Sequence, residues 1–222
     1  MIKVRVPATS ANLGPGFDSL GISLSIYNEY GFSLKDEEGL FFEGVEKEFQ
    51  NEDNIIYKAI KKVFDKYDFK FYGLGITIIK QDIPISRGLG SSSSCIVAGL
   101  IGAFAFTQLY NGFLSFVIIV EIKPPKIAGH TLSGWPSIST AKFNISSLSI
   151  FLPINAKAPI NPAIFGGLIS TIMTNDKKPL YNCVNVKDGI KFVALIPRFK
   201  LSTEKAREYY LRKFYLKIVF II

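Results

Sequence analysis

A glycine- and serine-rich stretch at residues 84–94 has the composition of an anion-binding loop. It follows a strand-like segment at 74–80 and precedes an apolar, helix-like segment at 95–104. Glycines let the backbone approach a phosphate closely, and the N–H groups and dipole at a helix N-terminus attract its negative charge. Serine hydroxyls add donors and, once a nucleotide is bound, an oxygen ligand for magnesium. The stretch lacks the Gly-Lys-Ser/Thr ending of the P-loop, and by itself an ordinary turn explains it equally well.

A second loop, at residues 8–19, consists of small and polar residues with glycine and proline. It joins two stretches that alternate in hydrophobicity, 2–6 and 21–27, which are predicted to be paired strands. Long loops on a rigid scaffold often carry function. Asn12 and Asp18 are its candidate functional side chains, although such residues also simply cap turns.

One amphipathic helix is predicted between the two loops. Apolar residues recur at helical spacing over 55–64, with lysines on the opposite face, so that one face is expected to be buried. Residues 51–54 supply candidate N-cap side chains. The glycine-rich loop is therefore expected to lie in a mixed α+β domain.

The composition is that of a folded protein without disulfide staples. The chain has 222 residues, of which 48% are apolar and 20% charged, enough for a substantial core. Its cysteines, Cys95 and Cys183, form neither a disulfide framework nor a zinc pattern, which favours a reducing compartment. The N-terminal residues lack the apolar run of a secretory signal, so a cytoplasmic location is expected.

Charge is distributed unevenly along the chain. Residues 1–100 hold 11 Lys/Arg and 13 Asp/Glu, whereas residues 101–222 hold 15 and 5. Between Asp82 and Asp176 the only acidic residue is Glu121. Any metal-binding or proton-accepting carboxylate from that part of the chain must therefore be Glu121.

Four segments together resemble homoserine kinase, in the superfamily that also holds galactokinase and mevalonate kinase, the GHMP kinases. Residues 6–21 resemble the family's N-terminal signature, and 84–94 resemble its phosphate-binding signature, at the separation that the family uses. Residues 160–167 and 193–207 resemble two later segments. The resemblance covers about residues 1–104 and 160–208, and two long motifs in order are far more specific than either alone.

The resemblance implies a role for each matching position. Asn12 and Asp18 match positions that hold the amino group and hydroxyl end of L-homoserine, Arg207 matches one that pairs with its carboxylate, and Thr203 lies at the reacting end. Asp18 and Thr203 are thus the catalytic candidates, and Asn54 matches an adenine contact. Ser92 matches a magnesium ligand. The residues expected to wrap the ATP phosphates are Pro84, Ile85, Ser86, Arg87, Gly88, Leu89, Gly90, Ser91, Ser92, Ser93 and Ser94.

The resemblance also implies a fold and an activity. The fold is α+β, with a GHMP kinase N-terminal, ATP-binding domain over residues 1–150 and part of a ferredoxin-like C-terminal domain over 151–222. The activity is transfer of a phosphoryl group from ATP, with Mg²⁺, to the hydroxyl of L-homoserine, which gives O-phospho-L-homoserine in threonine biosynthesis. No nucleic-acid or membrane partner is expected, and a homodimer is left open.

The chain departs from the family pattern where the family binds magnesium. Before residues 162–167 the family carries Glu-Gly-His-Pro-Asp-Asn, but residues 153–161 contain no carboxylate. Glu121 and Asp18 are the conceivable substitutes. Residues 105–159 are unlike the family, and 124–129 resemble 162–167 read backwards, which suggests an inverted or misread gene segment. Residues 209–222 also no longer resemble the family, so catalysis is expected to be weak or absent.

Other functional interpretations stay open at this point. A non-catalytic, nucleotide-binding remnant of the family is the main alternative. The basic second half allows an RNA-binding module, although its Lys and Arg are scattered singly. Residues 97–120 are apolar enough to imitate a membrane span, but polar residues and glycines interrupt them. His130 and Cys95 are expected to be structural.

Overall fold

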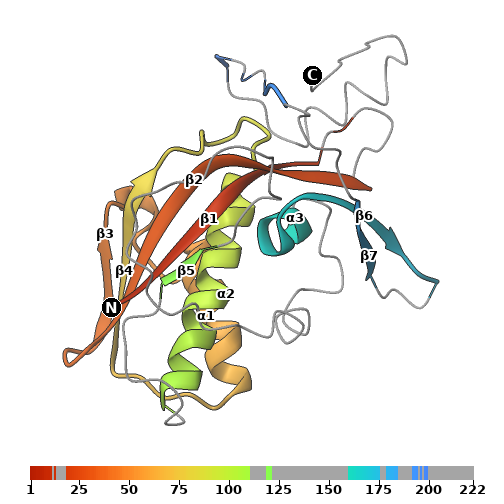
Figure 1. Cartoon of the computed structure of the whole chain (residues 1–222). Coiled ribbons are helices and arrows are strands. Elements are labelled where there is room, and N and C mark those ends of the chain that lie inside the picture. The colour runs from red at the N-terminus through yellow and green to blue at the C-terminus, as the bar shows by residue number, and fades with distance from the viewer. Residues whose placement is uncertain are drawn as a thin grey trace.

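The structure, a computed structural model, describes residues 1–11, 13, 19–110, 119–121, 160–175, 179–184, 192–194, 196 and 198–199. Figure 1 traces the elements from the N-terminus to the C-terminal part of the chain. In chain order they are β1 (Ile2–Ser10), β2 (Leu20–Lys35), β3 (Gly39–Glu43), the 3-10 helix η2 (Lys47–Phe49), α1 (Ile55–Lys66), β4 (Gly73–Gln81), α2 (Ser91–Tyr110), β5 (Ile119–Glu121), α3 (Ile160–Phe165), β6 (Leu168–Met173) and β7 (Pro179–Val184).

The described strands form one mixed sheet in the order β3-β4-β2-β1-β5. The long strand β2 is its centre, because it pairs antiparallel with β1, β4 and β6. β3 runs parallel to β4, and β5 runs parallel to β1. The outermost hairpin, β6–β7, extends the sheet from the start of β2, where Leu20 pairs with Ser170.

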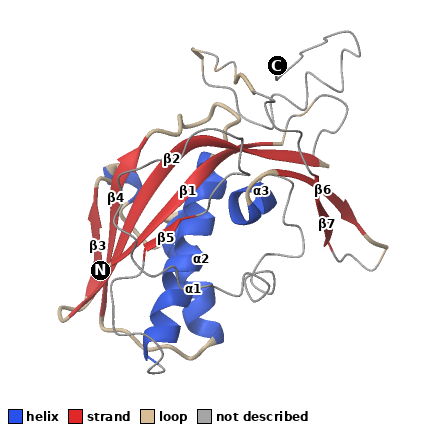
Figure 2. Ribbon diagram, viewed as in Figure 1, coloured by secondary structure: helices blue, strands red, loops and turns tan. Residues whose placement is uncertain are grey.

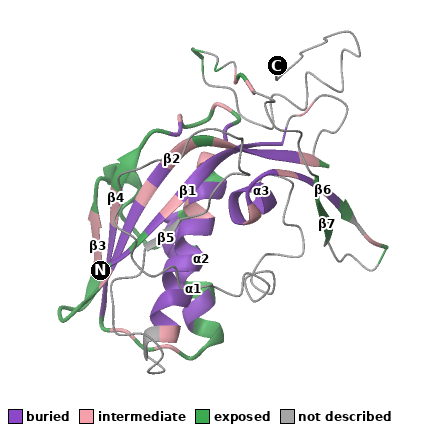
Figure 3. Cartoon of the chain, viewed as in Figure 1, coloured by how far each residue is buried: buried purple, intermediate pink, exposed green. Residues whose placement is uncertain are grey.

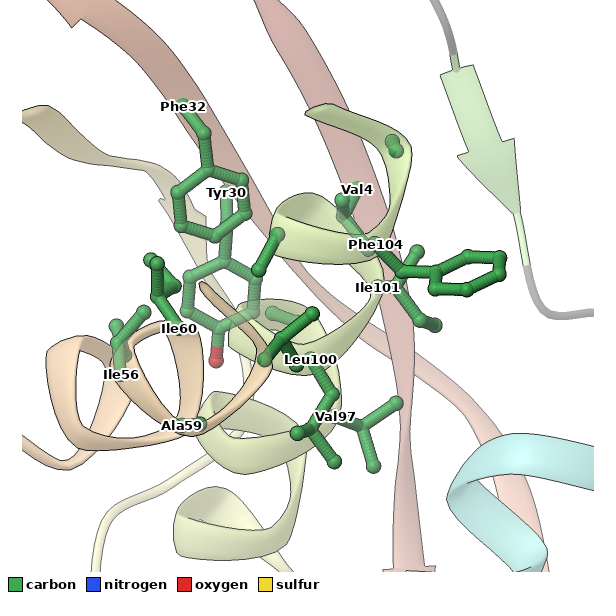
Figure 4. Close-up of a cluster of buried hydrophobic side chains, with 14 of the residues drawn as sticks. Val4, Tyr30, Phe32, Ile56, Ala59, Ile60, Val97, Leu100, Ile101 and Phe104 are labelled. Atoms are coloured by element: carbon green, nitrogen blue, oxygen red, sulfur yellow. The ribbon is translucent and has the colours of Figure 1, made fainter. Parts of the chain in front are cut away.

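Helices α1 and α2 cover one face of this sheet, as Figure 2 shows. Apolar side chains of β1, β2 and β4 meet both helices in a single large cluster. Figure 3 shows the burial of the inner strands and of α2, and Figure 4 shows the packing of Tyr30 and Phe32 against the helices. The members labelled there are Val4, Tyr30, Phe32, Ile56, Ala59, Ile60, Val97, Leu100, Ile101 and Phe104.

Two glycines allow α2 to pack this closely. A Cβ on Gly99 would lie 2.6 Å from the carbonyl oxygen of Ile56 in α1, and one on Gly102 would overlap the ring of Phe32 in β2. Such contacts are too short for carbon, so side chains at these positions would push α2 away from its neighbours.

The structure confirms the predicted α+β class and the individual elements expected at 2–6, 21–27, 55–64, 74–80 and 95–104. Helix α2 begins at Ser91, earlier than the apolar pattern alone indicated, because the serines themselves form its first turn. Among the described residues, α2 is the one helix long and apolar enough to cross a membrane, and 72% of its Ser91–Gln108 window is buried within the protein. Its apolar character is that of a core helix.

The second domain is described only in part. α3, β6 and β7 fall within residues 151–222, and the Phe165 ring of α3 stacks on Tyr181 of β7 with centroids 4.4 Å apart. The division at residue 150 and the ferredoxin-like character of the second part stay predictions, because residues 122–159 lie outside the described part of the chain.

Candidate functional site

The glycine-rich loop, residues 82–90, connects the end of β4 to the first turn of α2. Three residues in it have a positive φ: Ser86 at 56°, Gly88 at 72° and Gly90 at 71°. Glycine adopts this conformation without steric cost, and a Cβ on Gly90 would in addition overlap the hydroxyl of Thr9. The loop therefore folds tightly against the end of β1, with its backbone in a shape that a side chain at Gly90 would prevent.

The start of α2 is suited to an anion. Its first turn carries no acidic side chain, so nothing of that kind competes for the backbone N–H groups or opposes the helix dipole. The N–H of Ser94 donates to the carbonyl of Gly90 at 2.8 Å, which joins the helix directly to the loop. Ser92 is exposed, whereas Ser93 and Ser94 are buried. Of the serines predicted to bind ATP or magnesium, Ser92 is thus accessible to a ligand and Ser94 is enclosed.

The end of β1 packs against the glycine-rich loop and forms a hydrogen bond with it. The N–H of Thr9 donates to the carbonyl of Leu89 at 3.0 Å. Leu89 itself is buried in a small apolar cluster with Ala8 and Ile83. The hydroxyl of Thr9 is fully buried and has no hydrogen-bond partner among the described residues. β1 and the glycine-rich loop, which are about eighty positions apart in sequence, are thus a single local structure.

A chain of buried polar groups lies behind the loop. Asn28 accepts from the N–H of Ile83 at 2.8 Å and donates through Nδ2 to the Tyr30 hydroxyl at 3.0 Å. That hydroxyl is 2.7 Å from Ser94 Oγ and 3.5 Å from Cys95 Sγ. Burial raises the pKa of the Tyr30 phenol far above its ordinary value, and burial also raises the pKa of the Cys95 thiol. Both groups are therefore neutral at physiological pH.

Asn54 caps α1. Its Oδ1 accepts from the N–H groups of Ile56 at 2.8 Å and Tyr57 at 3.3 Å, and its Nδ2 donates to the carbonyl of Phe49 at 2.8 Å. The cap predicted from sequence is confirmed. The Asn54 residue is only 4% exposed, and both Oδ1 and Nδ2 have hydrogen-bond partners within the protein. Its contact with adenine stays a prediction.

Arg87 links the glycine-rich loop to the segment 193–207, which resembles a later segment of the homoserine kinases. Its Nη2 donates to the carbonyl of Arg198 at 3.1 Å, so Arg198 lies beside the loop. Its Nη1 is buried and has no partner among the described residues. A buried guanidinium N–H without an acceptor, next to a glycine-rich turn, is suited to an anionic ligand.

Four predicted substrate residues, Asn12, Asp18, Thr203 and Arg207, lie outside the described residues. Their chain neighbours are placed: Thr9 contacts the glycine-rich loop, and the carbonyl of Ser19 accepts from the N–H of Thr171 at 2.7 Å. The segment that carries Asn12 and Asp18 therefore starts at the glycine-rich loop and ends at the β2–β6 junction.

A carboxylate site for a metal is not found in the described part of the chain, where no group of three His, Cys, Asp or Glu residues could hold one. The backbone of Glu121 pairs with Arg5 in β5–β1 register. The interpretation of Glu121 as a substitute magnesium ligand stays a prediction.

Sequence reasoning missed Asn28, Tyr30 and Thr9. Asn28 and Tyr30 are two positions apart in β2, so their side chains lie on the same face of the strand, and they are only 3% and 0% exposed. An asparagine on the buried face of a strand is a signal of a polar network, because a buried amide must find partners. Nothing in the local sequence, however, indicates that its partners are at positions 83 and 94.

Comparison with known proteins identifies the relatives of this chain. The family described as the GHMP kinases N terminal domain matches residues 54–122, which include α1, the glycine-rich loop and α2. A homoserine kinase of Clostridium botulinum (strain Eklund 17B / Type B) is 49% identical over 93% of this chain and 59% of its own length. The homoserine kinase of Clostridium beijerinckii is 47% identical over 94% and 59%.

Solved structures share the fold. The crystal structure of homoserine kinase from Cytophaga hutchinsonii has a TM-score of 0.63 at 21% identity, over 93% of this chain and 59% of that one. The Methanococcus jannaschii mevalonate kinase has a TM-score of 0.52 at 13% identity, over 83% and 56%. This chain spans about three fifths of the length of the curated relatives that it matches. It is similar to the homoserine kinases over most of its own length, and its residues 54–122 match the N-terminal domain of the GHMP kinases.

Proposed function

We propose that this chain carries the nucleotide-binding part of a homoserine kinase, which transfers the terminal phosphoryl group of ATP to the side-chain hydroxyl of L-homoserine. The observation that carries the proposal is the positive-φ turn at Gly88 and Gly90, which leads directly into α2. Arg87 Nη1 beside it, for which the described part of the chain offers no acceptor, supports the same proposal. Both features fit the polyphosphate of a nucleotide.

The proposed roles at the loop follow from its geometry. Backbone N–H groups of residues 88–91 and of the first turn of α2 would donate hydrogen bonds to the phosphate oxygens, and the Arg87 guanidinium would add a positive charge. Ser92 would hold magnesium, as its exposure allows. When bound, ATP supplies the phosphoryl group and magnesium neutralises charge on its phosphates. The reaction depends mainly on positioning and charge neutralisation, so few catalytic side chains are needed.

The proposed substrate contacts come from the segments on either side of the loop. Asn12 and Asp18 would bind the amino group and hydroxyl end of homoserine, Arg207 its carboxylate, and Thr203 would lie at the reacting end. The hydrogen bonds Thr9–Leu89 and Arg87–Arg198 support this arrangement, since they attach the glycine-rich loop to residues three positions before Asn12 and five positions before Thr203.

We further propose that turnover is weak in this chain. Residues 153–161 supply no carboxylate where the family has its magnesium glutamate. Loss of charge neutralisation at the transferring phosphate costs several kcal/mol of transition-state stabilisation, on the order of a hundredfold or more in rate. The proposed setting is the cytoplasm, with ATP and homoserine as partners, no nucleic acid and no membrane; a homodimer stays a prediction.

Isothermal titration with a non-hydrolysable ATP analogue and Mg²⁺, with and without homoserine, tests the proposal. Binding of both ligands, together with slow turnover in a coupled assay, is the expected result. Binding of the analogue without any homoserine binding or turnover would support the alternative, a nucleotide-binding remnant, which the missing carboxylate favours. Absence of analogue binding would overturn both functions.

A further inference from the structure

We propose that Asn28, Tyr30 and Ser94 are positioning residues, which hold the two ends of the glycine-rich loop in place through a one-directional chain of hydrogen bonds. This path of hydrogen bonds runs from Ile83, near the start of the loop, to Ser91, the first residue after it. The existence of this support rests on the described geometry alone; its consequence for nucleotide affinity rests on the proposed function.

The five groups form an unbroken path. Its links are Ile83 N to Asn28 Oδ1 at 2.8 Å, Asn28 Nδ2 to Tyr30 Oη at 3.0 Å, Tyr30 Oη to Ser94 Oγ at 2.7 Å, and Ser94 Oγ to the carbonyl of Ser91 at 2.8 Å. All four distances are those of good hydrogen bonds. The loop residues 84–90 lie between the two ends of this path, so β2 fixes the positions at which the loop leaves β4 and enters α2.

The direction of each bond follows from the donors available. The amide of Ile83 can only donate, so Asn28 presents Oδ1 to Ile83 and Nδ2 to Tyr30. Ser94 has one hydroxyl proton, which it donates to the carbonyl of Ser91. The Tyr30 phenol must therefore donate to Ser94. Every hydroxyl and amide in the path accepts from one side and donates to the other, an arrangement in which hydrogen bonds polarise and strengthen one another.

Burial makes the path costly to interrupt. Asn28 is 3% exposed, and Tyr30 and Ser94 are 0% exposed. A buried polar group that loses its partner has no water to replace it, so removal of one hydroxyl leaves two other groups unsatisfied. Tyr30→Phe keeps the ring that packs against α1 and α2 but removes the central link, after which Ile83 and Ser91 are no longer coupled.

Amide hydrogen exchange, measured by NMR on the whole chain without ligand, tests the support directly. In Tyr30→Phe and in Ser94→Ala, the amides of Ile83 and Ser94 should lose about tenfold in protection, while core amides such as that of Val63 keep theirs. The double variant should lose about as much as either single variant, because both interrupt one path.

Two control variants separate this effect from simple loss of a buried hydroxyl. Thr107→Val removes a buried hydroxyl that donates to the carbonyl three residues earlier in the same helix, as Ser94 does, but that lies near its other end. Tyr57→Phe changes another buried tyrosine of the same core cluster. Neither should alter exchange at Ile83 or Ser94.

A second measurement concerns the nucleotide. The affinity for the ATP analogue should fall about tenfold in Tyr30→Phe and Ser94→Ala, equal to about 1.4 kcal/mol, and stay unchanged in both controls. Exchange at Ile83 and Ser94 that is unchanged in Tyr30→Phe would overturn the support, whatever the nucleotide does. Faster exchange in a chain that never binds the analogue would uphold the support and overturn the proposed function instead. Faster exchange with unchanged affinity would overturn the positioning role.

Discussion

The N–H of Thr9 donates to the carbonyl of Leu89 at 3.0 Å, and the Thr9 hydroxyl occupies the space that a side chain on Gly90 would need. The last residues of β1 and the tightest part of the glycine-rich loop are therefore built against each other. Since Thr9 belongs to the first sequence motif and Gly90 to the second, this contact brings the two motifs to one place.

Gly90→Ala should lower the free energy of unfolding by more than the cost of a positive φ alone. Gly39 is the matched control, because its φ is also positive, at 126°, but a Cβ there would meet nothing within 4 Å. Gly39→Ala is expected to cost roughly 1–2 kcal/mol, and Gly90→Ala to cost several kcal/mol and to abolish binding of the ATP analogue. Urea unfolding measures the first effect and titration the second. Equal costs in the two variants would show that Thr9 and Gly90 are not in contact.

Thr9→Val should stabilise the chain without ligand by about 1 kcal/mol. Valine has nearly the same shape, and the substitution removes a buried hydroxyl that lacks a partner among the described residues.

The control variant, Thr171→Val, should change the free energy of unfolding in the opposite direction. Thr171→Val removes a hydroxyl that accepts from Asn161 Nδ2 at 2.9 Å, and it should destabilise the chain by about 1–3 kcal/mol because it leaves that amide unsatisfied. Both free energies come from urea unfolding. Destabilisation of equal size in the two variants would mean that the Thr9 hydroxyl has a partner after all.

Stability should fall at alkaline pH because of Tyr30. Burial, the largest cause, raises the pKa of its phenol in the folded chain above the ordinary value of 10.0. The unfolded chain therefore loses this proton first as pH rises, so the stabilisation is fully present below about pH 10 and declines above it. Urea unfolding between pH 8 and 11 should give a shallower decline in Tyr30→Phe. An identical decline in both proteins would contradict the assignment.

Ser92→Ala should affect magnesium-dependent binding without affecting stability. Its side chain is exposed, so the free energy of unfolding should change by less than about 0.5 kcal/mol. If Ser92 holds magnesium, the gain in ATP affinity that Mg²⁺ provides should shrink about tenfold. Ser25→Ala, at another exposed serine, on β2, is the control. An unchanged magnesium effect in Ser92→Ala would remove this residue from the metal site.

Local signals in the sequence predicted β1, β2, α1, β4 and α2. The alternation in β1 and β2, the helical spacing and asparagine cap of α1, and the strand-loop-helix order around residues 84–94 each involve residues close in sequence. They act through backbone propensity and hydrophobic periodicity, which depend on neighbours a few positions away. The positive-φ conformations at Gly88 and Gly90 follow from the same local chemistry.

Tertiary structure determined which of these elements, and which of their residues, contact one another. The apolar pattern of α2 fitted both a membrane span and a core helix, and only the packing of α1 and the sheet around it distinguished the two. The link between Tyr30 and Ser94 joins residues 64 positions apart, and the contact between Thr9 and Gly90 joins more distant ones. Which distant groups meet depends on sheet register and helix packing, and a linear pattern does not encode these at any one position.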